Sequence, residues 1–363
     1  MADKILLVEP NFPTNNKNKK HKRFIPLGLL KLASYHRSLG DEVRLVRGWE
    51  ENGFKPNKIY VTSLFTYWSK YVWDAVQTYK RLFPSVPITV GGIYATLMPD
   101  HCMKSGCDEV FIGLHDEAEL HQPAYDLVDP EFQIIHTSRG CIRNCSFCGV
   151  WRIEPEFTYK KTIAEEIFKN KIVFYDNNIL ANPYIENILS EIRSARVNGK
   201  AVVCESQCGL DGRLLTPELA KLLKKARLVY PRIAWDHQFE HHEQIKAQID
   251  ILERVGYRPR NIYVFMIYNY KFGYEELDMK RQKCLEWGIQ IADCRYRPLN
   301  QTFDNYDPQA WKKGQTEKDY FIHPDWTDTQ NRKFRRQVRE QNIVIRHGFK
   351  EYSREKEIAG RKK

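Results

Sequence analysis

The feature of this sequence that most restricts its fold is a regular alternation of short apolar runs with helix-spaced segments. In the first 128 residues, apolar runs typical of strands lie at 4–10, 42–47, 59–65, 88–90 and 109–112. Segments with helical spacing of apolar residues lie among them at 26–39 and 68–82. Strands that alternate with helices pair in parallel, because each helix returns the chain to the same end of the sheet. The sequence therefore predicts an α/β fold with a parallel sheet.

We expect residues 1–128 to form a doubly wound, flavodoxin-like (Rossmann-type) domain. Open sheets of this kind bind ligands beyond the carboxyl ends of their strands, where the strand order reverses. This rule points to the loop of residues 11–23 and to the Gly91-Gly92-Ile93-Tyr94 segment that follows the fourth strand.

The alternation continues through residues 129–297, which we predict to be a second domain. Strands are expected at about 132–137, 171–176, 201–206, 230–236, 261–267 and 290–296. Helices are expected from Thr162, at 182–198, after Thr216 as N-cap with Pro217 in the first turn, at 242–255 and at 274–287. Six such units make a partial (β/α)6 barrel, with its chemistry at the carboxyl ends of the strands. Residues 298–363 lose the period, and we expect an irregular, basic C-terminal extension with a helix near 331–345.

Three cysteines follow the first strand of the second domain at the spacing C-x3-C-x2-C. They are Cys141, Cys145 and Cys148, with the aromatic Phe147 before the last. Thiolates are soft ligands that suit zinc or an iron–sulfur cluster. A structural zinc ion needs a fourth ligand, and the nearby His136 lies on the strand. A four-iron cluster held by three thiolates would keep one iron open.

Composition restricts the setting in which the chain works. A length of 363 residues fits two domains, and nine cysteines are too few for a disulfide scaffold. Their clustering favours a reducing compartment and a metal role. No run approaches the roughly 18 apolar residues of a membrane span, and the N-terminus has no signal-peptide pattern. We therefore expect a soluble, cytoplasmic protein that does not associate with membranes.

The net charge of +11 is concentrated in two segments. Residues 11–23 carry five Lys or Arg and no acid, and residues 331–363 carry twelve against four acids. Such patches could meet phosphate, which favours a phosphate-bearing substrate or nucleic acid. A solvated basic tail that aids solubility is the alternative, and the sequence leaves both open.

In this order of strand, loop and repeat, the three cysteines resemble the motif of the radical S-adenosylmethionine (SAM) superfamily, over about residues 130–297. The resemblance implies that Cys141, Cys145 and Cys148 hold a [4Fe–4S] cluster whose open iron binds the amino and carboxylate groups of SAM. One electron from the reduced cluster would then cleave SAM to a 5′-deoxyadenosyl radical. The resemblance also implies a reductant partner of the flavodoxin or ferredoxin type.

The same resemblance places further SAM contacts at the strand ends of this chain. Asp176-Asn177-Asn178 stand where the family usually has Gly-Gly-Glu for the SAM amino group, and Asp236 matches a polar residue that meets the ribose. Tyr268 would lie by the adenine, and Arg295 would face the SAM carboxylate or the substrate. The expected cofactor-binding residues are Phe147, Asp176, Asn177, Asn178, Glu205, Gln207, Asp236, Tyr268 and Arg295.

Residues 26–43, 90–94 and 108–118 resemble, in order, the cobalamin-binding domain that precedes many radical SAM barrels. The D-x-H-x-x-G signature that gives a histidine to cobalt is absent, because its place reads Glu9-Pro10-Asn11-Phe12-Pro13. Relatives without this histidine either hold cobalamin or have lost it, and both remain open here. With cobalamin the outcome would be C-methylation; without it, isomerisation, oxidation or another radical modification.

Two alternatives stay open at this stage. Cys204, Cys208 and Cys294 are either packing residues or, near the barrel mouth, ligands of an auxiliary cluster or a radical-quenching thiol. Cys102, Cys107 and Cys284 are taken as packing residues. The rival function is a non-catalytic Fe–S protein that binds nucleic acid or a partner. The sequence does not name the substrate.

Overall fold

A computed structural model describes residues 2–13, 25–50, 53–309, 314–349 and 351. The chain divides into two compact units. Unit 1 comprises Met1–Glu131, Asn144–Pro155 and Pro298–Asn305, and unit 2 comprises Phe132–Arg143, Glu156–Arg297 and Tyr306–Lys363. The cysteine loop therefore starts in unit 2 with Cys141 and continues in unit 1 with Cys145 and Cys148.

Unit 1 is built on a five-stranded parallel sheet of order β2-β1-β3-β4-β5. This is the flavodoxin-like order, so the predicted fold of the N-terminal segment is confirmed. The strands are β1 (Lys4–Glu9), β2 (Glu42–Arg47), β3 (Lys58–Ser63), β4 (Ile88–Gly92) and β5 (Glu109–Val110). The helices are α1 (Leu27–Ser38), α2 (Ser69–Leu82), α3 (Ile93–Leu97), α4 (Pro99–Met103), α5 (Asp116–Glu119) and, from a later segment, α6 (Val150–Ile153).

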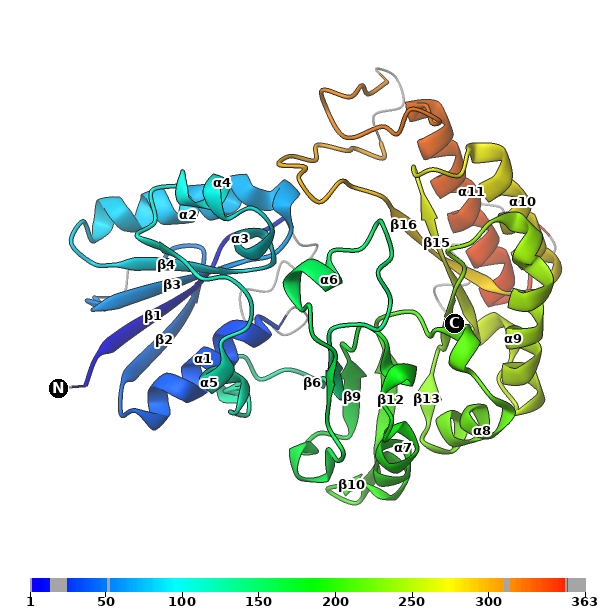
Figure 1. Cartoon of the computed structure of the whole chain (residues 1–363), viewed down its shortest axis with the longest axis horizontal. Helices are drawn as coiled ribbons and strands as arrows, with labels where there is room; N and C mark the ends of the chain where they lie inside the picture. Colours follow the sequence, from blue (N-terminus) through cyan, green and yellow to red (C-terminus); the bar gives the residue numbers. More distant parts are fainter. Residues whose placement is uncertain (1, 14–24, 51–52, 310–313, 350, 352–363) are drawn as a thin grey trace. The chain divides into compact units, whose positions relative to one another are not determined.

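Apolar side chains on both faces of this sheet are buried under helices. On one face, Val8, Val61 and Val90 pack with Val72 and Val76 of α2. On the other face, Ile5 and Leu7 pack with Leu29 and Ala33 of α1. Figure 1 shows α2, α3 and α4 on one side of the strands and α1 with α5 on the other. Burial on both faces explains why the strands read as continuous apolar runs.

Unit 2 contains a curved layer of parallel strands in two hydrogen-bonded groups. The orders are β13-β12-β9-β6 and β14-β15-β16, and a single bridge between Leu210 and Ile233 lies between them. The strands are β6 (Gln133–Ile135), β9 (Lys171–Phe174), β12 (Val203–Ser206), β13 (Leu228–Val229), β14 (Arg232–Ala234), β15 (Tyr263–Tyr268) and β16 (Gln290–Arg295). The fourth predicted strand is thus divided at Tyr230, whose φ of +52° breaks the ladder.

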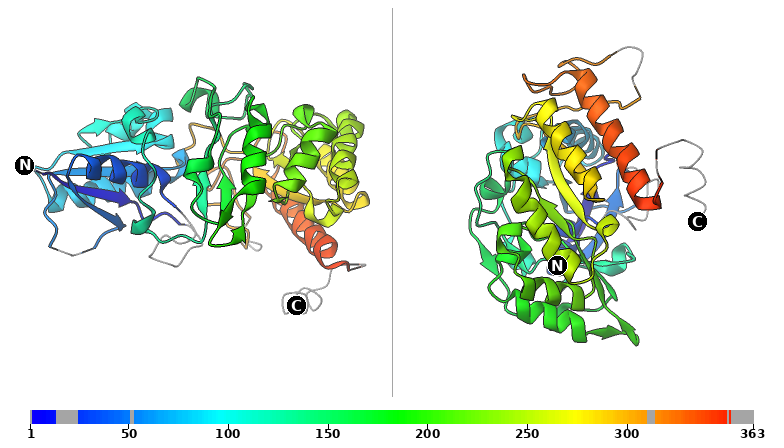
Figure 2. Two further views of the ribbon diagram at one scale, coloured as in Figure 1. Left: turned by 90° about the horizontal axis from the view of Figure 1, so that it is seen from below. Right: turned by 90° about the vertical axis from the view of Figure 1, so that its right-hand side faces the viewer.

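The helices α7 (Ile185–Ser194), α8 (Pro217–Lys225), α9 (His242–Arg254) and α10 (Tyr274–Glu286) alternate with these strands. Figures 1 and 2 show them along the outer side of the strand layer. Thr216 caps α8 as predicted, since its side chain accepts a hydrogen bond from the Leu219 N–H at 3.1 Å. A final helix, α11 (Asp328–His347), covers β16 and α10. Two short antiparallel pairs join β7 (Ser138–Arg139) with β8 (Thr158–Tyr159) and, as a hairpin, β10 (Arg196–Val197) with β11 (Lys200–Ala201).

The helix predicted from Thr162 is wrong, because only a single 3-10 turn forms at Ala164–Glu166. The buried Gln133 side chain accepts hydrogen bonds from the N–H groups of Phe168 and Lys169 at 2.9 and 2.8 Å. Its amide donates to the Glu166 carbonyl at 2.9 Å. These contacts satisfy the backbone groups that a longer helix would have paired, so the chain leaves the helical path.

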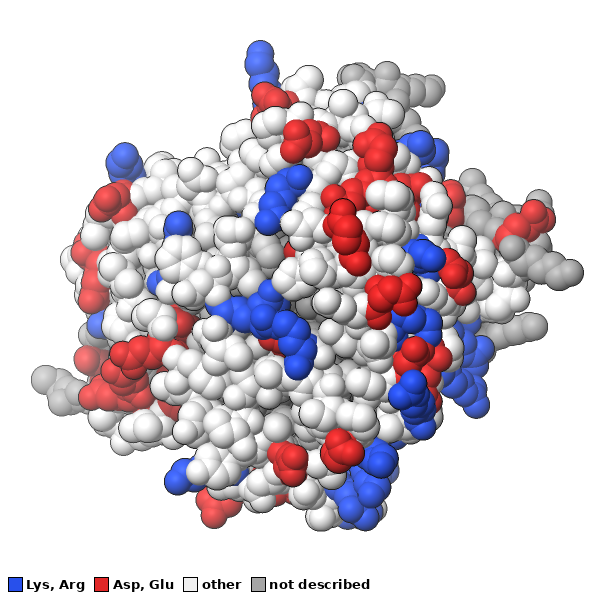
Figure 3. Space-filling model, turned by 45° about the vertical axis from the view of Figure 1, so that its right-hand side comes forward, with Lys and Arg blue, Asp and Glu red and all other residues white. Residues whose placement is uncertain are grey.

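The basic segments that the sequence singles out are only partly visible. Residues 14–24, 350 and 352–363, with most of the predicted basic loop and the end of the tail, lie outside the described residues. Within α11, Lys333, Arg336 and Arg339 are exposed. On the face drawn in Figure 3, most of the surface is neither basic nor acidic, and scattered groups of Lys and Arg lie among groups of Asp and Glu. None of the helices that the structure describes is long and apolar enough to cross a membrane.

Candidate functional site

The cysteine loop leaves the strand layer after β6 and the short β7. Gly140 makes the turn before it with a φ of +70°, which a residue with a side chain rarely adopts. Cys141, Cys145 and Cys148 are all half-buried. The Cys148 N–H donates to the Cys145 carbonyl at 3.0 Å, and the Arg143 N–H approaches the Cys141 sulfur at 3.4 Å. Backbone contacts thus shape the loop without using the cysteine side chains as cross-links.

The start of this loop is held by Asp176, which directly follows β9. Asp176 Oδ1 accepts hydrogen bonds from the backbone N–H groups of Thr137 and Ser138 at 3.0 and 2.6 Å, and from their hydroxyls at 2.6 and 2.8 Å. The side chain is fully buried, and this burial raises the pKa of Asp176 against the effect of the four donors. Both oxygens of Asp176 thus already accept hydrogen bonds from Thr137, and a contact of Asp176 with SAM stays a prediction. These bonds make Asp176 a positioning residue for the loop.

Of the two asparagines after Asp176, Asn178 has an acceptor atom that is available to a ligand. Asn178 is buried, and its Nδ2 lies 3.4 Å from Asp211 Oδ2. Its Oδ1 has no hydrogen-bond partner among the described residues. A buried acceptor without a donor is costly, so a donor group of a bound molecule fits this position. Asn177 is half-buried beside it.

Asp236 lies at the end of β14, close to the cysteine loop's own arginine. Its Oδ2 is 3.6 Å from Arg143 Nη1, and 13% of its side chain is exposed. Burial raises the pKa of Asp236, and the positive charge of Arg143 opposes the shift. Sequence reasoning missed Arg143, although its position between Cys141 and Cys145 could have indicated a role.

Two side chains of α10 make hydrogen bonds to the backbone of the loop that follows Asp236. The buried Lys280 Nζ donates to the His237 carbonyl at 2.6 Å, and Glu276 accepts the Phe239 N–H at 2.9 Å. Lys280 also lies 4.2 Å from the centre of the Phe272 ring. Burial lowers the pKa of Lys280 to about 8, against the attraction of Glu276. Nothing in the helical pattern distinguishes this lysine from an exposed one, so the sequence could not identify it.

The polar residues at the end of β12 have different surroundings from one another. Glu205 pairs with Arg232 of the neighbouring β14, and Arg232 also donates to the Ser206 carbonyl. Gln207 is exposed. Glu205 therefore already has a cationic partner, whereas Gln207 is accessible to a ligand.

Two predicted cofactor contacts point away from the open face of the strands. In β15, Val264, Met266 and Tyr268 are buried, whereas their alternate neighbours are half-buried. Tyr268 packs against Trp326 and Phe334 of the C-terminal segment, with ring centres 6.0 and 5.3 Å away. The Tyr268 side chain therefore faces the C-terminal segment, and strand alternation places the Ile267 side chain on the opposite face. A contact of Tyr268 with the adenine stays a prediction.

Arg295 of β16 pairs directly with Tyr268 of β15, so both side chains lie on the same face of the strands. Its guanidinium lies between the Tyr306 and Tyr320 rings, 4.4 and 4.8 Å from their centres, and the side chain is buried. This stacking places Arg295 in the core beneath the C-terminal segment, and its contact with SAM or a substrate stays a prediction. The preceding Cys294 is exposed instead.

The remaining cysteines separate by burial. Cys204 and Cys284 are fully buried and pack in the core of unit 2, and Cys102 and Cys107 pack in that of unit 1. Cys208 is half-buried, and Cys294 is exposed on the inner face of β16. Although Cys294 is exposed at its own surface, the residues packed around it withdraw the thiol from bulk water and raise its pKa to about 11. Among the described residues, no three His, Cys, Asp or Glu side chains are gathered as a single metal ion requires.

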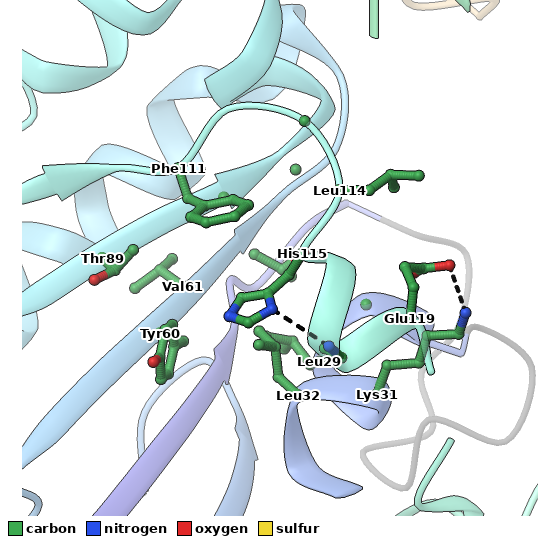
Figure 4. Close-up of a pocket in the computed structure, with 16 residues that line it drawn as sticks. Leu29, Lys31, Leu32, Tyr60, Val61, Thr89, Phe111, Leu114, His115 and Glu119 are labelled. Atoms are coloured by element: carbon green, nitrogen blue, oxygen red, sulfur yellow. Dashed lines mark hydrogen bonds and ion pairs between the residues drawn. The ribbon is translucent and has the colours of Figure 1, made fainter. Parts of the chain in front are cut away.

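Unit 1 has a cavity of about 150 Å³ beyond the carboxyl ends of β3 and β4. Its walls are mainly apolar and are lined by Leu29 and Leu32 of α1, Val61 of β3, and Phe111 and His115 after β5 (Figure 4). Gly91 and Gly92 form part of the lining, as the switch-point rule predicts for that segment. Gly92 has a φ of +104°, and an added Cβ would lie 2.2 Å from the Ser63 carbonyl oxygen.

No protein-family model matches the sequence, and a search of curated proteins found no match. The fold, however, is similar to solved structures. A structure of the radical S-adenosylmethionine methyltransferase TsrM from Kitasatospora setae, with cobalamin and a [4Fe-4S] cluster bound, matches with a TM-score of 0.63 and 15% identity, over 83% of this chain and 77% of that chain. A second TsrM structure, with tryptophan substrate and the SAM analogue aza-SAM, gives a TM-score of 0.60 and 14% identity, over 83% and 75%. At this identity the likeness establishes the fold alone.

Proposed function

We propose that the chain is a radical SAM enzyme, with a corrinoid-binding domain at residues 1–128, a catalytic barrel at 129–297 and a C-terminal extension at 298–363. The observation that carries the proposal is the C-x3-C-x2-C loop, which follows β6 at the carboxyl end of a parallel α/β strand layer and is anchored by Asp176. The fold shared with a radical SAM methyltransferase supports the same reading.

The donor chemistry of the loop fits a [4Fe–4S] cluster. Three thiolates, Cys141, Cys145 and Cys148, leave one of four irons for an exogenous ligand. When bound, the cluster supplies one electron that breaks the sulfonium C–S bond of SAM, which yields methionine and a 5′-deoxyadenosyl radical. A reductant of the flavodoxin or ferredoxin type restores that electron.

The chain's own residues would hold SAM beside this loop. The unpaired Oδ1 of Asn178 and the neighbouring Asn177 can accept hydrogen bonds from its amino group, and Asp236 can accept them from the ribose. The positive charge of Arg143 favours the ionised form of Asp236 against the effect of burial, while Lys280 and Glu276 fix the backbone that follows. Phe147 and Gln207 are further contacts, and Glu205 acts together with Arg232.

Unit 1 would bind a corrinoid. The apolar cavity and the Gly91-Gly92 floor suit a planar heterocycle, and a cavity of about 150 Å³ takes the benzimidazole of cobalamin rather than its macrocycle. When bound, the cofactor supplies a methyl carrier, which would make C-methylation the reaction. No histidine of the D-x-H-x-x-G type is required by this arrangement.

The test is anaerobic reconstitution with iron and sulfide, followed by SAM and dithionite with and without hydroxocobalamin. We expect cluster absorbance, release of 5′-deoxyadenosine, and S-adenosylhomocysteine as well if methyl transfer occurs. The triple variant Cys141→Ala, Cys145→Ala and Cys148→Ala should lose both the cluster and the cleavage. Cys284→Ala, at a buried packing cysteine, should keep both. A cluster-loaded protein that never releases 5′-deoxyadenosine would instead support the non-catalytic Fe–S alternative.

A further inference from the structure

His115 in the cavity of unit 1 is held in one orientation by two contacts. Its Nδ1 accepts a hydrogen bond from the Ala118 N–H at 3.3 Å and thereby caps α5. Its ring stacks on Phe111, with centres 5.3 Å apart and planes inclined by 17°. Both the position and the plane of the imidazole are therefore set before any ligand arrives.

The cap also fixes the tautomer. An Nδ1 that accepts a hydrogen bond carries no proton, so the neutral ring has its proton on Nε2. Figure 4 shows the capped nitrogen turned toward α5 and the other nitrogen turned toward the side of Tyr60, inside the cavity. The Nε2–H of His115 is thus a hydrogen-bond donor that faces a mainly apolar cavity.

Four of the other polar side chains around the cavity already have partners within the protein, and Thr62 is a further polar residue of the lining. The Tyr60 hydroxyl lies 3.1 Å from His36 Nε2, and Thr89 donates to Glu109 at 2.7 Å. At the rim, Lys31 Nζ pairs with Glu119 at 2.6 Å. His115 Nε2 has no hydrogen-bond partner within the part of the chain that the structure describes, so its donor is available to a ligand.

We propose that His115 is a specificity-determining residue, which selects a nitrogen heterocycle by donating from Nε2 to an acceptor nitrogen of that ring. In a corrinoid, this ring is the benzimidazole of the nucleotide, whose N3 accepts a hydrogen bond when it does not coordinate cobalt. A ring without an acceptor nitrogen leaves the donor unpaired in an apolar cavity, which costs affinity. The inference rests on the corrinoid part of the proposed function.

The experiment titrates the full chain with hydroxocobalamin and with cobinamide, which lacks the nucleotide and its base, and follows corrin absorbance. His115→Phe keeps the stacked ring, and His115→Asp keeps a side chain able to cap α5, while neither offers a donor in place of Nε2. Both variants should bind cobalamin about 3–10-fold more weakly and bind cobinamide as the wild type does. A cobamide with a phenolic lower group, which has no acceptor nitrogen, should bind equally to all three proteins.

Two further variants separate this role from general damage. His121 contacts the same Tyr35 ring as His115, 6.0 Å from its centre, but does not line the cavity, so His121→Phe should change neither affinity. An added Cβ at Gly28 meets open space, so Gly28→Leu should fill the cavity and weaken cobalamin binding alone. Equal losses for cobalamin and cobinamide in the His115 variants, or no loss, would overturn the inference.

Failure of the proposed function gives a different result. If the wild type binds neither corrinoid, the corrinoid assignment is wrong, and titration with the free nucleoside α-ribazole decides the role of His115. Binding of α-ribazole that weakens in both His115 variants would retain the donor role, whereas absent or His115-independent binding would overturn it.

Discussion

The two units finish their parallel strands in opposite ways. In unit 1, β4 ends in Gly91-Gly92, and apolar side chains surround a cavity beside them. In unit 2, β9 is followed by the polar run that begins with Asp176. The Asp176 carboxylate accepts hydrogen bonds from the loop that follows the neighbouring strand β6. The carboxyl edge of a parallel sheet therefore has a different role in each unit. Small residues leave room for a ligand, whereas buried polar residues hold a reactive loop in place.

The strongest test of this contrast removes the Asp176 carboxylate. Asp176→Ala leaves the N–H groups and hydroxyls of Thr137 and Ser138 buried without their acceptor, which we expect to cost about 4–5 kcal/mol of unfolding free energy. Urea denaturation measures the loss. Asp176→Asn should lose less, because one amide oxygen still accepts. A folded Asp176→Ala protein with normal cluster loading and stability would show that the carboxylate does not position the loop.

The corresponding test in unit 1 adds a methyl group to the strand end. Gly92→Ala places a Cβ 2.2 Å from the Ser63 carbonyl oxygen at a φ of +104°, so we expect a loss of about 3–4 kcal/mol and of the cavity. Gly91→Ala is the matched control, because its Cβ would meet only Phe111 Cβ at 3.7 Å. Thermal unfolding of the two variants should differ by several degrees. Equal stabilities would mean that close approach at Gly92 is not what shapes this edge.

The contrast also explains what the sequence could and could not predict. The strands of unit 1 were predictable because burial on both faces leaves continuous apolar runs. In unit 2, the strand ends were located to within two residues, and the direction of each side chain depends on a parity that an error of one residue reverses. Tyr268 and Arg295 show this dependence, because both side chains are buried on the face that packs against the C-terminal segment.

Long-range polar contacts were beyond sequence reasoning altogether. Gln133 ends the turn near Glu166 from 33 positions away, and Lys280 holds His237 from 43 positions away. Glutamine and lysine are both ordinarily exposed, so neither residue type indicates such a contact in the sequence. The cysteine motif could be recognised because its three residues are close together in the sequence. The residues that hold the loop in place come from distant elements.

A further prediction concerns Lys280, the buried lysine of α10 that holds the loop at His237. Its pKa of about 8, lowered by burial from 10.5, means that the unfolded chain binds more protons between these two pH values. The wild type should therefore gain stability relative to Lys280→Met as the pH rises from 8 to 10.5, by about 3 kcal/mol at most. Denaturation of both proteins at several pH values gives the difference. A difference that is flat with pH would contradict the burial of a charged Lys280.

The smallest expected effect provides the scale for the others. Thr216→Ala removes an ordinary helix cap, the 3.1 Å hydrogen bond to the Leu219 N–H, and should cost about 1 kcal/mol. It lies in the same unit as Asp176 and also accepts from backbone N–H groups, but at a solvent-facing helix start. If urea denaturation gives Thr216→Ala and Asp176→Ala similar losses, then burial adds nothing to the Asp176 contacts. In that case, the distinction between strand ends that hold a loop and those that leave room for a ligand would fail for unit 2.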